Sequence, residues 1–481
     1  MTSFLLIGLY GAVLALLAVY GAHRLWLLLG FRWSGRADAL GPAEAPLPSL
    51  TVQLPLYNER TVAARLLRAA GALDYPADRF ELQVLDDSDD ETRSIVDREV
   101  AALVARGVDA RVLRRGARTG FKAGALDRGM SEARGELFCV FDADFVPPPA
   151  FLRALVPAFA DPRVGLVQAR WEHENRGASA LTRAQSILLD GHFVIEHKVR
   201  HERGLFFNFN GTAGVWRRAA IEDAGGWQHD TLTEDLDLSY RAQLRGWRFV
   251  YAPCVTAPAE VPPSIGAFKS QQQRWAKGSV QVTRKLLGAI LASGVPLRVK
   301  VEALAHLSGN AGYPLVLLLA VLLPLTLHVE QRFDGWAHLV FFLLCTSTVA
   351  LFYDASQRAL GRSGRARLFD VPAAIALGIG MCVSQTRAVW EGASGATGAF
   401  VRTPKRGDAP ARAGYRALAR GWPGLELAFA AWFAWGILAA CERHLWGALP
   451  FLTLFLAGFA WVGLLSLAEW RDARRARLRP A

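Results

Sequence analysis

The 481-residue chain is too long for one ordinary domain, and its apolar residues, 52% of the total, gather in long runs at the N-terminus and after Leu304. Residues 45–265 have the mixed composition of a soluble domain, so the sequence predicts a membrane protein with one soluble insert. The net charge of +12 does not indicate nucleic-acid binding, because much of the excess lies beside the apolar runs and no recognition motif accompanies it. The five cysteines are scattered without a CxxC spacing, which argues against a disulfide framework and against a zinc site.

The first predicted element is a membrane-spanning helix over Phe4–Leu29, an almost uninterrupted apolar run that is longer than the core of a signal peptide. No Lys or Arg precedes it, whereas Arg24 lies near its C-terminal end and Arg32 and Arg36 follow. The positive-inside rule therefore predicts an integral protein of the cell inner or plasma membrane, with the N-terminus outside and the soluble domain in the cytosol. Residues 1–40 form the predicted N-terminal helix and linker.

Residues 41–263 alternate between strand-like and helix-like segments. Strands are predicted at Ser49–Tyr57, Phe80–Asp86, Ala110–Leu113, Glu136–Asp142, Val164–Arg170 and Arg248–Ala252, and helices at Asp90–Arg106, Lys122–Ala133 and about Ala178–Lys198. This alternation favours a parallel, Rossmann-like α/β sheet. In such sheets, ligands bind beyond the carboxyl ends of the strands.

Two acidic patches lie at that edge of the predicted sheet. Asp86 and Asp87 end one strand, and Asp142 and Asp144 lie at the tip of another. Two aspartates separated by one residue can supply oxygen ligands to a hard cation, Mg²⁺ or Mn²⁺, that also holds two phosphates. The first patch has an alternative interpretation as a polar loop that caps the next helix, and we expect both the cap and a free carboxylate at Asp86 or Asp87.

Two further segments carry candidate polar residues. Lys122 lies among small residues that would let a ligand approach, although a solvated lysine at a helix N-terminus is the alternative. Glu234 and Asp235 begin another predicted helix, with Thr233 as its cap. Acidic residues are ordinary in a first helical turn, but an ionised Asp235 that faces a cleft would also be suited to act as a general base.

Residues 264–302 predict an amphipathic helix on the membrane surface. Such a helix accounts for Arg274 but not for Gln271 and Trp275 beside it. An aromatic ring suits the apolar face of a pyranose, and arginine suits a phosphate. A residue that suits a sugar and a residue that suits a phosphate thus lie side by side in the sequence, where the soluble domain meets the predicted membrane region.

Residues 303–481 form the predicted transmembrane region. Spans are expected at Ala303–Leu327, Trp336–Tyr353, Leu425–Ala440 and Ala448–Leu467. The apolar core of segment 371–391 is only about thirteen residues long, short of the roughly twenty that a span needs. Because Arg-rich loops flank it on both sides, we predict an interfacial or re-entrant helix, five spans and a cytosolic C-terminus. The alternative is a sixth span with residues 400–420 outside.

The order and spacing of these patches resemble a known family. They are Leu85–Ser88, Phe141–Asp144, Thr233–Asp235 and Gln271–Trp275, and they resemble the membrane-integrated processive family-2 glycosyltransferases of the cellulose-synthase superfamily. Gln168–Trp171 and Phe209–Thr212 are more similar to the cellulose-synthase-like mannan and glucomannan synthases than to true cellulose synthases. The resemblance implies an α/β GT-A (Rossmann-like) cytosolic domain and an α-helical transmembrane domain with interfacial helices.

The resemblance also implies a role for each matching residue. Asp235, with Glu234, would be catalytic; Asp86, Asp87, Lys122, Asp142, Gln271 and Arg274 would bind the donor diphosphate; Phe209, Asn210, Gly211, Thr212 and Trp275 would bind the acceptor; and Asp142 and Asp144 would hold the metal. Residues 398–408 resemble a gating loop in which Thr403 and Lys405 reach the nucleotide phosphates. Arg402 departs from that loop's pattern, which has Val at this position.

The implied activity is inverting, processive transfer of a hexose from a nucleotide sugar, GDP-mannose or UDP-glucose, to a β-1,4-linked polysaccharide of the mannan or glucomannan type. The growing polysaccharide, which would pass through the membrane, and membrane lipid are the expected partners, an export partner is left open, and no nucleic acid is expected. The alternatives are a β-glucan synthase that uses UDP-glucose and a non-processive transferase that modifies a lipid such as a ceramide. A transport or scaffold protein with an inactive transferase domain, and a glycoside hydrolase with paired carboxylates, are more distant alternatives.

Overall fold

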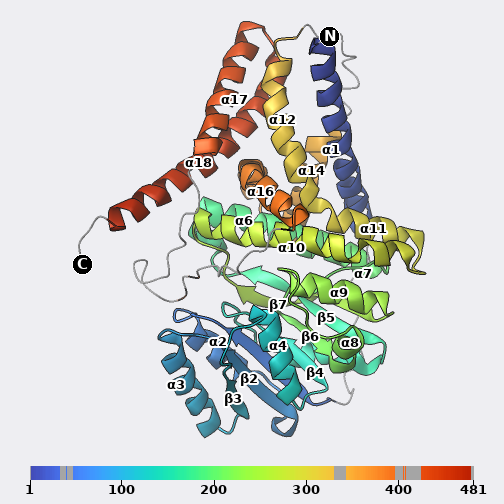
Figure 1. The fold of residues 1–481 in the computed structure, drawn as a ribbon, viewed down its shortest axis with the longest axis vertical. Coiled ribbons are helices and arrows are strands. Elements are labelled where there is room, and N and C mark those ends of the chain that lie inside the picture. Colours follow the sequence, from blue (N-terminus) through green and yellow to red (C-terminus); the bar gives the residue numbers. More distant parts are fainter. Residues whose placement is uncertain are drawn as a thin grey trace.

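The chain folds into an α/β domain that lies against a set of long apolar helices (Figure 1). The computed structural model describes residues 2–32, 40, 47–329, 343–395, 405, 407 and 424–477. Helices α6 (Ala180–Asp190) and α10 (Ile265–Ala292) lie between the sheet and the apolar helices. The chain therefore contains both parts of the predicted fold class, an α/β domain and a set of apolar helices.

The α/β domain is built on one seven-stranded sheet with the order β3-β2-β1-β4-β6-β5-β7. The strands are β1 (Leu50–Leu56), β2 (Phe80–Asp86), β3 (Ala110–Leu113), β4 (Leu137–Val140), β5 (Val164–His173), β6 (Gly214–Arg217) and β7 (Arg248–Ala259). The prediction of a parallel sheet does not hold at β6, which runs antiparallel to both β4 and β5. Gly214 pairs with Val140 at the carboxyl end of β4, so β6 starts at that edge and has to run back across the sheet.

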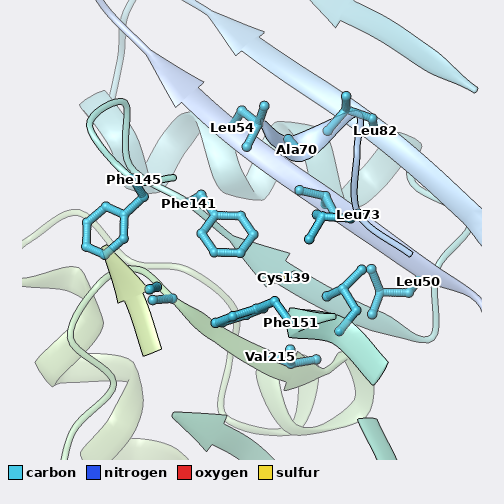
Figure 2. Packing of buried hydrophobic residues seen from close by; sticks show 14 of the residues in the cluster. Leu50, Leu54, Ala70, Leu73, Leu82, Cys139, Phe141, Phe145, Phe151 and Val215 are labelled. Carbon is cyan, nitrogen blue, oxygen red and sulfur yellow. The ribbon is translucent and has the colours of Figure 1, made fainter. Parts of the chain in front are cut away.

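Apolar side chains cover both faces of the sheet. The helices of this domain are α2 (Ala63–Ala70), α3 (Thr92–Ala105), α4 (Phe121–Glu132), α5 (Phe151–Leu155), α8 (Arg218–Asp223) and α9 (Glu234–Leu244). Leu137 and Cys139 of β4 join one buried cluster, whereas Phe138 and Val140 join the other, as the two-residue period of a strand requires. Figure 2 shows Cys139 in the first cluster with Phe141 and Phe151.

The predicted helix at about 178–198 is interrupted by a change of helical type. A capping box formed by Ser179 and Thr182 starts α6, which passes into a π-helical turn, Gly191–His197, and then into α7 (Lys198–Glu202). A π-helical turn rotates the side chains that follow it, and such turns are frequent at functional sites.

Four helices in the described part of the chain are long and apolar enough to cross a membrane: Phe4–Arg32, Gly309–Thr326, Gly424–Glu442 and Trp446–Arg475. They belong to α1 (Thr2–Arg32), α12 (Gly312–Thr326), α17 (Gly424–Glu442) and α18 (Leu449–Arg477). The predicted span at 303–327 starts too early, because residues 297–307 form a separate helix, α11 (Leu297–Leu307). The predicted span at 336–353 lies partly outside the described residues; its described part includes the start of α14 (Thr348–Ala359).

Segment 371–391 falls within two helices that meet at a bend. Helices α15 (Gly364–Gly380) and α16 (Cys382–Ala393) are inclined by 48° and together have the length and composition of a broken span or a re-entrant loop. The contact of α15 with α18 is close, since a Cβ atom at Gly380 would lie 2.3 Å from the carbonyl oxygen of Gly458. Small residues permit such an approach between helices in a membrane.

Ion pairs tie several basic residues of α10, the predicted amphipathic helix, to other parts of the chain. Lys269 lies 2.5 Å from Glu426 of α17, and Lys285 lies 2.9 Å from Asp237 of α9. Lys277 is buried. Helix α10 therefore joins the α/β domain to the apolar helices.

Candidate active site

An open cleft with about 1280 Å³ of space, part of it open to solvent, lies at the carboxyl edge of the sheet, beneath α10. It brings together most of the residues singled out in the sequence. Asp87, Lys122, Asp142, Asp144, Asn210, Gly211, Glu234, Asp235, Gln271, Arg274, Trp275 and Lys405 line it. Residues from seven separate stretches of the chain thus converge on one site.

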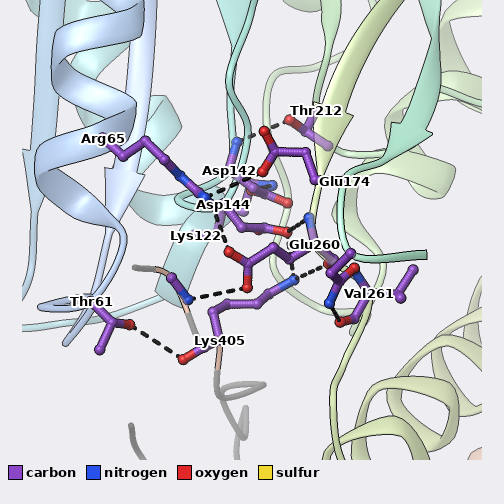
Figure 3. A network of polar contacts seen from close by, with 12 residues as sticks. Thr61, Arg65, Lys122, Asp142, Asp144, Glu174, Thr212, Glu260, Val261 and Lys405 are labelled. Carbon is purple, nitrogen blue, oxygen red and sulfur yellow. Dashed lines mark hydrogen bonds and ion pairs between the residues drawn. The ribbon is translucent and has the colours of Figure 1, made fainter. Parts of the chain in front are cut away.

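The aspartate pair follows β4 and meets two lysines (Figure 3). The Nζ of Lys122 lies 2.5 Å from Asp142 Oδ1, and it donates to the carbonyl of Gly211 at 2.8 Å. The Nζ of Lys405 lies 2.7 Å from Asp144 Oδ2. Burial raises the pKa of Asp144 even though Lys405 opposes the rise, whereas the pKa of Lys122 is raised because Asp142 and other carboxylates outweigh its burial.

The two aspartates fit a divalent cation that also has ligands from elsewhere. Each carboxylate already attracts a positive ammonium group, and the Asp142 side chain is 38% exposed to the cleft. Among the described residues, however, there is no group of three or more His, Cys, Asp or Glu side chains with the geometry of a metal site. A cation bound to Asp142 and Asp144 would need its other oxygen ligands from a substrate or from water.

Asp86 and Asp87, the residues of the first acidic patch, have different surroundings. Asp86 is 1% exposed and its carboxylate pairs with Arg114 at 2.9 Å, so the structure does not place it among the cleft residues. Asp87 does line the cleft, and it pairs with Arg115. The expected helix cap is formed from one residue before the N-cap position, which Glu91 occupies: the carboxylate of Asp90 accepts the backbone N–H of Thr92 at the start of α3.

The segment that precedes β6 contributes two of its four predicted residues to the cleft. Asn210 and Gly211 line the cleft, whereas Phe209 is fully buried against Trp216 in the core. Thr212 is also buried, and its hydroxyl accepts the backbone N–H of Asp142 at 2.9 Å. Phe209 and Thr212 therefore support the segment and do not line the cleft.

Gly211 has to be glycine at this position. Its φ is +79°, and a Cβ atom there would lie 2.9 Å from Asp235 Oδ2. The close approach brings the backbone of this segment directly against the carboxylate.

Asp235 lies in the first turn of α9 and faces the cleft. Burial and the neighbouring Glu234 raise its pKa to about 7, against the opposing effect of Lys122. The predicted side-chain cap at Thr233 is not formed: the residue occupies the N-cap position, but its buried hydroxyl has no hydrogen-bond partner among the described residues. It packs instead against Gly278 of α10.

Gln271, Arg274 and Trp275 reach the cleft from the first half of α10. The ring of Trp275 lies 6.4 Å from that of Trp171, so two indoles stand near each other on one side of the cleft. Burial lowers the pKa of Arg274, although Glu234 and Asp142 oppose this effect.

Several cleft residues were not assigned to the site from the sequence. Trp171 and His173 at the end of β5, and Glu260 just after β7, also line the cleft. Their position at the carboxyl ends of strands is the signal that would have indicated them. Tyr57 and Arg118 form a further pair, with the guanidinium 3.4 Å from the ring centre.

Lys405 is described in the structure, whereas Thr403 and the rest of the predicted gating motif, residues 400–404, lie outside the described residues. The backbone carbonyl of Lys405 accepts from the hydroxyl of Thr61 at 3.3 Å, and its Nζ also donates to the carbonyl of Glu260 (Figure 3). These bonds fix Lys405 at the cleft.

Comparison with known proteins finds similarity to glycosyltransferases, mainly in the α/β domain. Residues 48–278 match the model described as "Glycosyltransferase like family 2". A probable glucomannan 4-beta-mannosyltransferase 10 of Arabidopsis thaliana is 42% identical over 266 residues, which are 54% of this chain and 48% of the relative. A probable glucomannan 4-beta-mannosyltransferase 7 of Oryza sativa subsp. japonica is 38% identical over 335 residues, 66% of this chain and 57% of the relative. The chain thus spans about half the length of the curated relatives that it matches.

A solved structure supports the same fold. The mannosyltransferase PcManGT from Pyrobaculum calidifontis, in complex with GDP-Man and Mn²⁺, matches 80% of this chain and 99% of its own chain, with a TM-score of 0.55 and 22% identity. The predicted GT-A class is confirmed, with a mixed sheet in place of the parallel one. Residues 48–278 of this protein therefore form a family 2 glycosyltransferase domain.

Proposed function

We propose that this protein is an inverting hexosyltransferase that moves mannose from GDP-mannose to the growing end of a β-1,4-linked polysaccharide of the mannan or glucomannan type. The observation that carries the proposal is the position of Asp235, a half-buried carboxylate with a pKa raised to about 7, in the same cleft as Lys122 and Arg274. A proton acceptor and two cations in one cleft suit a reaction in which a hydroxyl loses a proton while a diphosphate departs. The choice of mannose rests on the plant relatives.

The donor diphosphate would bind between the aspartate pair and the cations of the cleft. Lys122 and Arg274 supply positive charge, and Lys405 adds a third cationic group beside Asp144. A Mg²⁺ or Mn²⁺ ion held by Asp142 and Asp144 would supply Lewis-acid stabilisation of the departing diphosphate. The bound Mn²⁺ of PcManGT supports this expectation.

The acceptor end of the polysaccharide would lie on the other side of Asp235. Trp275 offers an indole face that suits a pyranose ring, and Asn210 and Gly211 offer polar groups beside it. Gly211 allows the backbone of residues 209–212 to approach Asp235 closely. A sugar bound against this backbone would place its hydroxyl within reach of the carboxylate.

In the proposed reaction, Asp235 takes the proton of the acceptor hydroxyl as its oxygen forms a bond to the anomeric carbon. The bond from that carbon to the diphosphate oxygen breaks at the same time, and the electron pair leaves with the nucleoside diphosphate. Attack from the face opposite the leaving group turns an α-linked donor into a β-linked product. Lys122 and Arg274 offset the negative charge that develops on the diphosphate.

The apolar helices suggest how the product would be handled. We infer that the catalytic domain is cytosolic, that the N-terminus is outside, and that the polysaccharide passes through the membrane region. Arg24 and Arg32 at the domain end of α1 support this orientation.

The test uses the full chain, purified into nanodiscs and supplied with Mg²⁺ or Mn²⁺ and with radiolabelled GDP-mannose or UDP-glucose in separate reactions. The expected result is high-molecular-weight label from GDP-mannose that β-mannanase degrades, and at least about a hundredfold less of it from the Asp235→Asn variant in the same time. Polymer from UDP-glucose alone would move the assignment to a glucan synthase. Label found only in a small, organic-soluble product would overturn polymer synthesis in favour of a lipid transferase.

A further inference from the structure

The carboxamide of Asn210 is held between two histidines of the π-helical turn Gly191–His197. The Nε2 of His197 lies 2.7 Å from Asn210 Oδ1, and Asn210 Nδ2 lies 2.9 Å from the Nε2 of His192. The backbone N–H of Asn210 donates to Gln168 at 3.1 Å. The side chain of a cleft residue is thus held by groups that do not themselves line the cleft.

The surrounding bonds determine which way the carboxamide points. His197 Nε2 also lies 3.0 Å from the carbonyl oxygen of Asn208, which can only accept, so this nitrogen carries the proton. Burial and the charge of Arg200 hold the pKa of His197 well below its ordinary value, so that its ring is neutral. The oxygen of Asn210 therefore has to face His197, and its amide nitrogen has to face His192.

The second histidine is fixed in turn by a carboxylate. His192 accepts from Asn210 through Nε2, so its proton lies on Nδ1, which is 3.1 Å from Glu196 Oε2. Although burial favours the neutral acid, Arg200 and His192 hold the pKa of Glu196 well below its ordinary value. Glu196 is therefore a constant acceptor for His192.

This arrangement is anchored on the apolar helices. Arg200 donates to Glu196 at 3.1 Å and to Glu302 of α11 at 2.9 Å. The other oxygen of Glu302 lies 2.8 Å from His23 of α1. Buried polar chains of this kind are rigid when their members are paired, so the orientation of Asn210 depends on the contact between the α/β domain and the membrane region.

We propose that His192 and His197 are positioning residues that fix the carboxamide of Asn210 for recognition of the acceptor sugar. A carboxamide has two N–H groups and two oxygen lone pairs, and the histidines use one of each. The remaining N–H and lone pair form a fixed donor and acceptor pattern for a sugar hydroxyl. The inference rests on the proposed function, because it assigns Asn210 to the acceptor and not to the donor.

The test is a double-mutant cycle on the full chain in nanodiscs, with GDP-mannose saturating and a β-1,4-mannan oligosaccharide as the variable acceptor. His192→Phe is expected to raise the acceptor KM at least about tenfold, while the Kd for GDP-mannose and the rate of donor hydrolysis by water stay within about twofold of wild type. In an Asn210→Ala background, His192→Phe should add less than about twofold, since its partner is already gone.

A conservative variant and a remote variant serve as controls. His192→Gln keeps an oxygen acceptor for the Asn210 amide and should recover most of the acceptor KM. His444→Asn changes an exposed histidine in the turn between α17 and α18, where φ is 57°, and should behave as wild type. Additive effects of His192→Phe and Asn210→Ala, or an equal loss of donor binding, would overturn the inference. A wild-type protein that transfers sugar to no acceptor would instead overturn the proposed function.

Discussion

At Asp235, burial and the adjacent Glu234 carboxylate raise the pKa to about 7, so that the side chain is near the midpoint of its titration at neutral pH. A general base is most effective when its pKa lies near the working pH. We expect Asp235→Asn to lower the transfer rate by a factor of about 10² to 10⁴, while GDP-mannose binding is largely kept. In the wild type, kcat/KM should rise as the pH increases through about 7 and then level off, because only the ionised carboxylate accepts a proton. A pH–rate profile measures this, and a flat profile between about pH 6 and 8 would remove Asp235 as the base.

The same burial has a cost for stability. A carboxyl whose pKa is higher in the folded state than in the unfolded chain binds its proton more tightly when folded, so its contribution to stability falls as the pH rises from the unfolded value of 3.8 through about 7. The Asn side chain of the Asp235→Asn variant does not ionise, so the variant does not lose stability in this way as the pH rises. We expect the variant to have a higher apparent unfolding temperature than wild type at about pH 8, and a smaller difference at about pH 6. Asp78→Asn, at an exposed aspartate, is the matched control. Its unfolding temperature should differ from that of wild type by the same amount at both pH values.

At the scale of elements, the contact of α10 with the start of α9 holds the turn that carries Glu234 and Asp235 in position. A Cβ atom at Gly278 would lie 2.5 Å from the side chain of Thr233, which immediately precedes Glu234 and Asp235. On the same helix, a Cβ atom at Gly288 would meet nothing within 4 Å. An alanine at Gly278 would therefore disturb the packing of α10 against α9, whereas an alanine at Gly288 would change only the helix propensity of α10.

We expect Gly278→Ala to lower the transfer rate at least about tenfold, because the start of α9 has to move away from α10. Gly288→Ala should leave the transfer rate unchanged and stabilise the helix by up to about 1 kcal/mol. Initial rates and apparent unfolding temperatures of both variants measure these effects. Equal rates for the two variants would mean that α9 tolerates the shift and that its position is not critical for activity.

At the scale of the whole molecule, the predicted orientation can be tested with the chain's own cysteines. Cys254 is exposed in the α/β domain, Cys139 and Cys382 are buried, and Cys441 lies at the end of α17. In a Cys441→Ser protein, a membrane-impermeant maleimide should label Cys254 only after permeabilisation of the cells, because a cytosolic domain is out of its reach. In a Cys254→Ser, Cys441→Ser protein, Thr2→Cys should be labelled in intact cells. The opposite pattern would place the catalytic domain outside.

The local sequence pattern determined the types of element in this protein and the edge of the sheet at which the cleft lies. Apolar runs in the sequence distinguished the long apolar helices from the α/β domain, because length and hydrophobicity decide whether a helix can cross a bilayer. Alternation of strands and helices predicted the sheet and the edge at which Asp87, Asp142 and Asp144 meet the cleft, because carboxyl ends of parallel strands share one edge. Most candidate site residues were found in this way or through their resemblance to a family.

The tertiary structure decided which distant residues meet. The antiparallel direction of β6, the pairing of Asp86 with Arg114, and the burial of Phe209 and Thr212 depend on how the chain returns to the sheet. The histidine pair around Asn210 depends on a π-helical turn that no periodicity in the sequence indicated. Lys405 meets Asp144 across 261 positions, and Arg200 meets Glu302 across 102. Such contacts were not readable from the sequence, because local patterns determine which face of an element is polar but not which distant charge lies opposite it.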